Sequence, residues 1–146
     1  MCDYFSAADD NAAVAVVDLP GGPGQASLDV VSLKNIDPVV CMASLEAIMA
    51  GCSYQEALRR PRSGQLLSSP DAESAFVVSV SDTLHELLAV ASEDDLARAA
   101  ESWSLTDELR MGRADADRAA GMLADLAGLA QRARVSDSHL YCWLAL

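Results

Sequence analysis

The chain has 146 residues, of which 51% are hydrophobic, and its mean hydropathy is +0.16. This length and composition suit one domain with one core and exclude a chain that is disordered throughout, which would lack enough apolar surface. The formal net charge of −12 argues against nucleic acid and anionic membranes as partners, because both require clustered Lys and Arg.

The N-terminal residues 1–5 contain no basic segment, and no apolar run in the chain approaches the roughly 20 residues of a membrane span. We therefore expect a cytoplasmic protein, in which Cys2, Cys41, Cys52 and Cys142 are free thiols. The cysteines form no C-x-x-C pair, and no EF-hand or two-His-one-carboxylate pattern occurs. The sequence thus predicts no metal site and no cofactor.

The first half of the chain alternates short apolar runs with helical patterns, as α/β domains do. The expected elements are a strand at 2–6, a helix at 8–18, a strand at 27–33, a helix from Asp37-Pro38 to Gly51 and a short helix at 53–60. Asp is a good N-cap, Pro suits the first helical turn, and Gly terminates helices. Gly21-Gly22-Pro23-Gly24 leads into a strand and lacks the Lys-Ser/Thr of a phosphate loop, so it reads as a turn.

The second half continues the alternation after a Ser/Pro/Gly-containing loop at 61–70. The expected elements are a strand at 75–80, a helix beginning at Ser81 or Asp82, a helix from Ser92 to about Trp103, a long helix at 116–133 and a strand at 139–146. The strand at 75–80 is apolar on both faces, which predicts a central position in the sheet. Together these elements predict a single-domain, three-layer α/β/α fold around a small mixed sheet.

Several short segments carry a resemblance to a known family. They are Asp3-Tyr4-Phe5, Leu33 with Asn35-Ile36-Asp37, Arg62-Ser63 with Leu66-Leu67, Phe76-Val77-Val78 before the helix from Asp82, the long helix from Asp115, and Leu140-Tyr141-Cys142-Trp143-Leu144. In this order the chain resembles the YfbM-like family of bacterial proteins of unknown function, over most of residues 1–146. The resemblance implies a three-layer α/β/α fold and no particular activity. The chain is shorter than the family type between Gly51 and Ala75.

The two histidines, His85 and His139, are the candidates for acid/base chemistry. His139 and Cys142 cannot act together on a strand, because alternation places them on opposite faces. His85, beside a leucine stripe, is either a boundary residue or a general base at a strand-to-helix turn.

Arg59, Arg60 and Arg62 form the one dense positive cluster. Either Arg59 and Arg60 offset the dipole at a helix C-terminus, or the cluster clamps a carboxylate or phosphate on a ligand or partner. Because no nucleophile, base, metal or phosphate motif converges, the sequence favours a small non-catalytic accessory or binding protein. Its partner would be a protein or a small metabolite, and a homo-oligomeric interaction module remains open. The alternative is a small enzyme that uses His85 or His139 in a cleft at the sheet edge.

Overall fold

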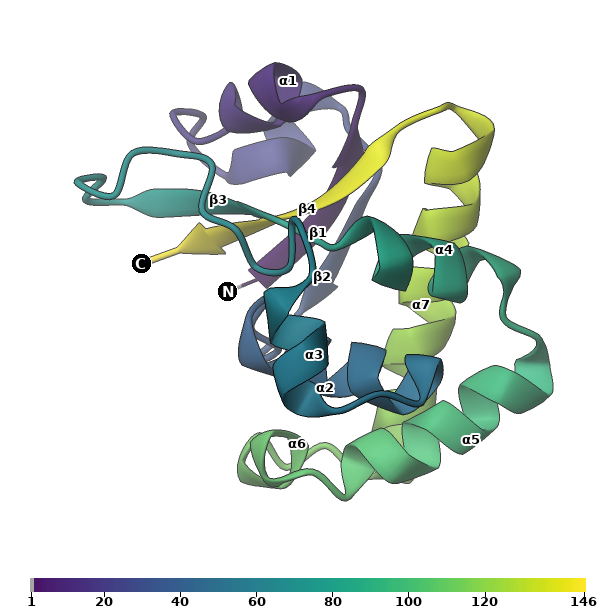
Figure 1. Cartoon of the computed structure of the whole chain (residues 1–146). Coiled ribbons are helices and arrows are strands. Elements are labelled where there is room, and N and C mark those ends of the chain that lie inside the picture. The colour runs from purple at the N-terminus through teal and green to yellow at the C-terminus, as the bar shows by residue number, and fades with distance from the viewer. Residues whose placement is uncertain (1) are drawn as a thin grey trace.

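The computed structural model describes residues 2–146, which form a four-stranded sheet with helices on both faces (Figure 1). The strands are β1 (Cys2–Ala7), β2 (Val30–Leu33), β3 (Ala75–Ser79) and β4 (His139–Ala145), in the order β2-β1-β4-β3. The α/β class is confirmed. We expected a mixed sheet, but all three strand pairs are antiparallel. The first and last strands, β1 and β4, lie side by side at the centre and run in opposite directions.

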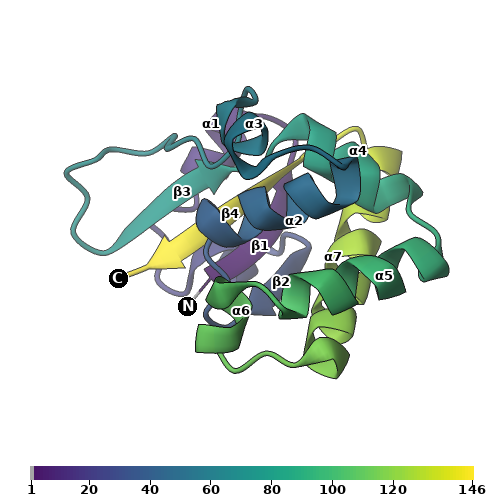
Figure 2. The same cartoon turned by 60° about the horizontal axis from the view of Figure 1, so that its bottom comes forward.

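Within the described residues, seven α-helices and one 3₁₀-helix, η1, surround the sheet. They are α1 (Asp10–Val14), η1 (Gly22–Ala26), α2 (Val40–Ala50), α3 (Tyr54–Arg59), α4 (Asp82–Val90), α5 (Glu93–Ser104), α6 (Asp107–Met111) and α7 (Ala116–Val135). Helices α2 to α7 gather on one side of the sheet, and α1 lies on the other (Figures 1 and 2). None of the helices within residues 2–146 has the length and apolarity needed to cross a membrane.

Strand alternation divides the interior into two cores. On β4, Leu140 and Cys142 face the larger core beneath the helices, whereas Tyr141 and Trp143 face the smaller core beneath α1 and η1. This is the alternation expected from the sequence. All four cysteines are free thiols, and three of them are buried.

Local capping signals locate most helix ends correctly. The Ser81 hydroxyl accepts from the Leu84 amide at the start of α4, and Ser92 and Asp95 form a reciprocal capping box at α5. Gly51 ends α2 in the left-handed conformation, with φ of 68°. Asp37 accepts from the amides of Val39 and Val40, so it caps one turn before α2 begins.

Two elements in the first 33 residues are shorter than expected. The predicted helix at 8–18 is α1 alone, because the chain turns after Val14 and brings Val16 and Leu19 onto the sheet. The predicted strand at 27–33 starts only at Val30, because Ser27 adopts a left-handed conformation at the end of η1. Helix α6 had no counterpart in the sequence prediction.

The expectation that β3 is central is wrong, because β3 lies at an edge of the sheet. Residues 65–67 cover that edge. The Leu67 amide donates to the Val77 carbonyl and the Ser79 amide to the Gln65 carbonyl, both at 2.9 Å. This coverage pairs outer backbone groups of Val77 and Ser79. The strand is apolar on both faces because Val78 lies in the larger core, whereas Ala75 and Val77 lie in the smaller one.

Candidate functional site

A polar hollow of about 440 Å³ opens where β4 begins, and it is the candidate site. It is lined by Asp9, Asp10, Asn11, Arg62, Asp82 and His139. These residues come from the start of α1, the loop after α3, the first turn of α4 and the first position of β4. We call this feature the polar hollow. Its residues come from four separate segments of the chain.

The Arg62 guanidinium and the Asp10 carboxylate form the fixed side of the polar hollow. Arg62 donates from Nη2 to Asp10 Oδ1 at 2.8 Å and from Nη1 to Oδ2 at 3.1 Å. The Tyr141 hydroxyl donates to the same Oδ1 at 2.8 Å, and the guanidinium carbon lies 5.8 Å from the centre of the Tyr141 ring. The hydrogen bonds from Arg62 hold the pKa of Asp10 below its ordinary value.

The backbone of the loop presents Arg62 to the hollow in an uncommon conformation. Its φ is 69°, in the left-handed region that few non-glycine residues occupy. The Ser79 hydroxyl donates to the Arg62 carbonyl at 2.7 Å and holds the turn against β3. A strained residue fixed by a neighbouring strand is a frequent feature of functional sites.

His139 and Asp82 form the opposite side of the hollow. His139 Nδ1 lies 3.4 Å from Asp82 Oδ1, and Arg62 Nε lies 3.7 Å from the same oxygen. Both side chains keep about half of their surface exposed, at 47% for His139 and 61% for Asp82. His139 therefore has access to a ligand in the hollow, and Asp82 is in a position to orient its ring.

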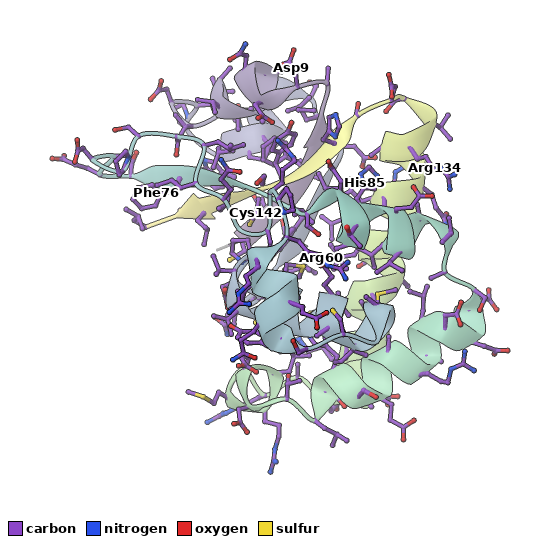
Figure 3. All side chains as sticks on the ribbon, in the orientation of Figure 1. Asp9, Arg60, Phe76, His85, Arg134 and Cys142 are labelled. Atoms are coloured by element: carbon purple, nitrogen blue, oxygen red, sulfur yellow. The ribbon has the colours of Figure 1, made fainter. Side chains whose placement is uncertain are left out.

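His85, the other candidate base, does not belong to the polar hollow. Its Nε2 lies 3.0 Å from the Ala130 carbonyl, and because a carbonyl only accepts, this nitrogen donates. The ring thus joins α4 to α7 (Figure 3). Its neighbour Glu86 makes a second contact between these helices, to Arg134 at 3.3 Å.

The three arginines of the positive cluster diverge. Arg59 is exposed, and only Arg62 lines the hollow. Arg60 points toward the interior, where its Nε lies 3.2 Å from Oε2 of the buried Glu46. Figure 3 shows Arg60 below the sheet and Asp9 above it. Arg60 and Arg62 thus face different carboxylates, Glu46 and Asp10, and do not point into one common site.

Glu46 connects two elements that border the polar hollow. Besides the ion pair with Arg60, its Oε1 accepts a hydrogen bond from the Ser81 hydroxyl, which also caps α4. The residue is 1% exposed. Asp82 follows Ser81 directly, and Arg62 follows Arg60 by two positions. The two contacts of the buried Glu46 therefore hold the segments that carry Asp82 and Arg62.

The charges of the polar hollow are unequal. Three carboxylates, from Asp9, Asp10 and Asp82, face a single guanidinium, and Asp10 already occupies that guanidinium with two hydrogen bonds. Asp9 accepts from the Ala12 amide through Oδ1, and Asp82 keeps most of its surface free. Within residues 2–146 no group of three or more His, Cys, Asp or Glu side chains is arranged to hold a metal.

Sequence reasoning identified His139 and Arg62 but missed their partners. Asp9 and Asp10 had the pattern of a helix first turn, Asp82 that of a helix cap, and Tyr141 that of a sheet-face aromatic. The available signal was that Asp82, His139 and the Asp9-Asp10 pair each stand at the junction of a strand and a helix. Searches of family profiles, curated proteins and solved structures find no match to this chain.

Proposed function

We propose that this chain is a non-catalytic binding protein whose polar hollow takes a small, positively charged group, on a metabolite or on a basic side chain of a partner protein. The supporting observation is the charge imbalance in the polar hollow. Asp10 holds Arg62 with two hydrogen bonds, whereas the carboxylate of Asp82 is 61% exposed and has only the longer contacts of 3.4 Å to His139 and 3.7 Å to Arg62. The net charge of −12 attracts such a ligand from a distance.

The size and lining of the hollow restrict the ligand further. A volume of about 440 Å³ lies within the usual range for small-molecule sites, but those sites are mostly apolar. A lining of charged and amide side chains favours a compact ligand with several hydrogen-bond donors, such as an ammonium or guanidinium group. Such a group can donate to Asp82 and Asp9 without disturbing the Arg62–Asp10 pair.

The test is a titration of the ¹⁵N-labelled full chain with agmatine and, for comparison, with succinate. We expect agmatine to shift the amides of residues 9–11, 62, 82 and 139, and succinate to leave them unchanged. Asp82→Asn should weaken agmatine binding about fivefold or more, whereas Asp94→Asn, an exposed change on α5, should have no effect. Equal affinity for both probes, or equal loss in both variants, would contradict the proposal.

A second candidate function is acid/base catalysis by His139, with Asp82 orienting its ring. The 3.4 Å contact between them and the exposure of His139 to the hollow favour this alternative over one based on His85. The two functions are separable, because His139→Gln should abolish turnover of a substrate yet leave agmatine binding within about twofold if His139 serves only in catalysis.

Membership of the YfbM-like family, a cytoplasmic location and assembly with further copies of the chain remain parts of this proposal. Four free thiols support a reducing compartment. Sedimentation of the purified chain and fractionation of the native cell test the assembly and the location.

A further inference from the structure

Among the residues that line the polar hollow, only His139 has a side chain of the type that gains or loses charge near neutral pH. Histidine side chains take up a proton between about pH 8 and pH 5, whereas aspartate and arginine side chains keep their charge across this range. The other histidine, His85, lies outside the hollow, with its Nε2 3.0 Å from the Ala130 carbonyl. A change of charge inside the hollow over this pH range therefore takes place at His139.

Charged groups from three other segments share the polar hollow with His139. The nearest is Asp82 at the start of α4, whose Oδ1 lies 3.4 Å from His139 Nδ1. The others are Asp9 and Asp10 at the start of α1, and Arg62 in the loop after α3. Three carboxylates and one guanidinium leave two negative charges in the lining while His139 is neutral. They leave one negative charge when His139 is protonated.

The neighbours of His139 in the sheet and along the chain add no charge to the hollow. Its partner on β1 is Ala7, and the Tyr141 hydroxyl, two positions along β4, donates to Asp10. Asp137, in the turn before β4, is exposed and does not line the hollow. Asp82 is thus the closest carboxylate for a protonated His139 ring.

The contact between His139 and Asp82 is long for a hydrogen bond. Its 3.4 Å exceeds the usual range for N–H···O bonds, and the two side chains are 47% and 61% exposed, so both have room to adjust. A proton on the ring converts the contact into a charge-assisted hydrogen bond, which is shorter and stronger. The protonated ring then occupies the carboxylate that a positively charged ligand needs.

We propose that His139 makes the polar hollow pH-dependent: its protonated ring pairs with Asp82 and displaces the positively charged ligand. This inference rests on the proposed function, since it concerns the regulation of the same site. The ligand and the protonated ring compete for one carboxylate and also repel each other. Ligand affinity should therefore fall as the pH falls, and by reciprocity a bound ligand should make His139 harder to protonate.

The test is the titration of the ¹⁵N-labelled full chain with agmatine at about pH 8 and about pH 5.5, at constant ionic strength. The amine and the guanidinium of agmatine both stay protonated over this range, so a change in affinity reports on the protein. We expect the affinity to be about fivefold lower at the acid pH, at the lower end of the usual coupling between two sites. The ring-proton signals of His139 should titrate at lower pH when agmatine is bound.

Three variants separate the histidine from its carboxylate partner. In His139→Gln the affinity for agmatine should be the same, within about twofold, at the two pH values, because no group in the hollow titrates between them. In Asp82→Asn the ring of His139 should titrate at lower pH even without a ligand, because the protonated ring has lost its partner. Asp137→Asn is the matched control, since Asn tolerates the φ of 55° at this exposed position, and it should keep the parent's fivefold change.

The outcomes distinguish this inference from the proposed function. Equal affinity at the two pH values in the parent, or a fivefold change that persists in His139→Gln, overturns the inference and leaves the proposed function in place. Equal shifts of the His139 titration in Asp82→Asn and Asp137→Asn overturn it as well, because Asp82 is then not the partner. Absence of agmatine binding at about pH 8 contradicts the proposed function itself, and the inference with it.

Discussion

Arg62 holds Asp10 through two hydrogen bonds of 2.8 and 3.1 Å, although 52 positions separate them in the chain. Tyr141 donates to the same carboxylate from a further 79 positions along the sequence. One carboxylate thus joins the N-terminal helix α1, the loop after α3 and the last strand. The polar hollow exists because these three segments meet there.

The Arg62–Asp10 pair should make stability depend on acid pH. Arg62 holds the pKa of Asp10 below its ordinary value of 3.8, so this stabilisation is present at neutral pH and is lost as the pH falls below about 4. The contribution should stay under about 1 kcal/mol, since Asp10 is about half exposed. Urea unfolding of the parent and of Asp10→Asn between pH 7 and 2.5 measures it. The difference in unfolding free energy between the parent and Asp10→Asn should shrink toward low pH. A difference that stays constant would contradict this account.

Glu46→Ala should destabilise the fold by about 2 kcal/mol, because it leaves Arg60 and the Ser81 hydroxyl without their carboxylate. This expected loss of stability is smaller than the loss on breaking a fully buried ion pair, because the Arg60 side chain is 28% exposed. Glu56→Ala, an exposed change on α3, should stay within about 0.5 kcal/mol. Chemical denaturation compares the two.

The double variant Glu46→Leu with Arg60→Met provides the control for the buried charge. It removes both charges together, so it should be less destabilising than Glu46→Ala alone. If the double variant is less stable than Glu46→Ala, the loss of stability comes from packing and not from the unpaired Arg60.

Gly22→Ala should be far more damaging than Gly24→Ala. A Cβ at position 22 meets the Trp143 ring at 2.6 Å and occupies a left-handed backbone, whereas a Cβ at position 24 meets nothing within 4 Å. We expect a loss of about 3 kcal/mol for Gly22→Ala and less than about 0.5 kcal/mol for Gly24→Ala. Thermal melts of the two variants check this, and equal melting temperatures would show that the turn moves away from the indole freely.

Truncation on the two faces of β4 should cost different amounts. Cys142 is fully buried beneath the helices, and Cys142→Ala removes one small group at about 1–2 kcal/mol. Trp143→Ala leaves a large void in the smaller core and should cost about 3–5 kcal/mol. Thermal melts rank the two variants. A Cys142→Ala protein that melts like the parent but loses agmatine binding would assign the thiol a function and not a packing role.

Signals that act within one helical turn or one strand could be read from the sequence. The caps at Ser81 and Ser92, the stop at Gly51 and the alternation of β4 all depend on residues at most a few positions apart. Each therefore sets local backbone geometry without knowledge of the rest of the chain. The α/β class follows from the order of these elements.

Tertiary structure alone decided the strand order and the polar hollow. The place of β3 at an edge depends on residues 65–67 pairing beside it, and the role of Arg62 depends on Asp10 and Tyr141, which no local pattern links to it. The sequence could not predict that Arg60 points toward Glu46, because it does not distinguish Arg60 from the neighbouring arginines. Such contacts form only when distant segments pack together, because hydrogen bonds and ion pairs act over a few ångströms in space. The type of a residue does not reveal which distant residue will become its partner.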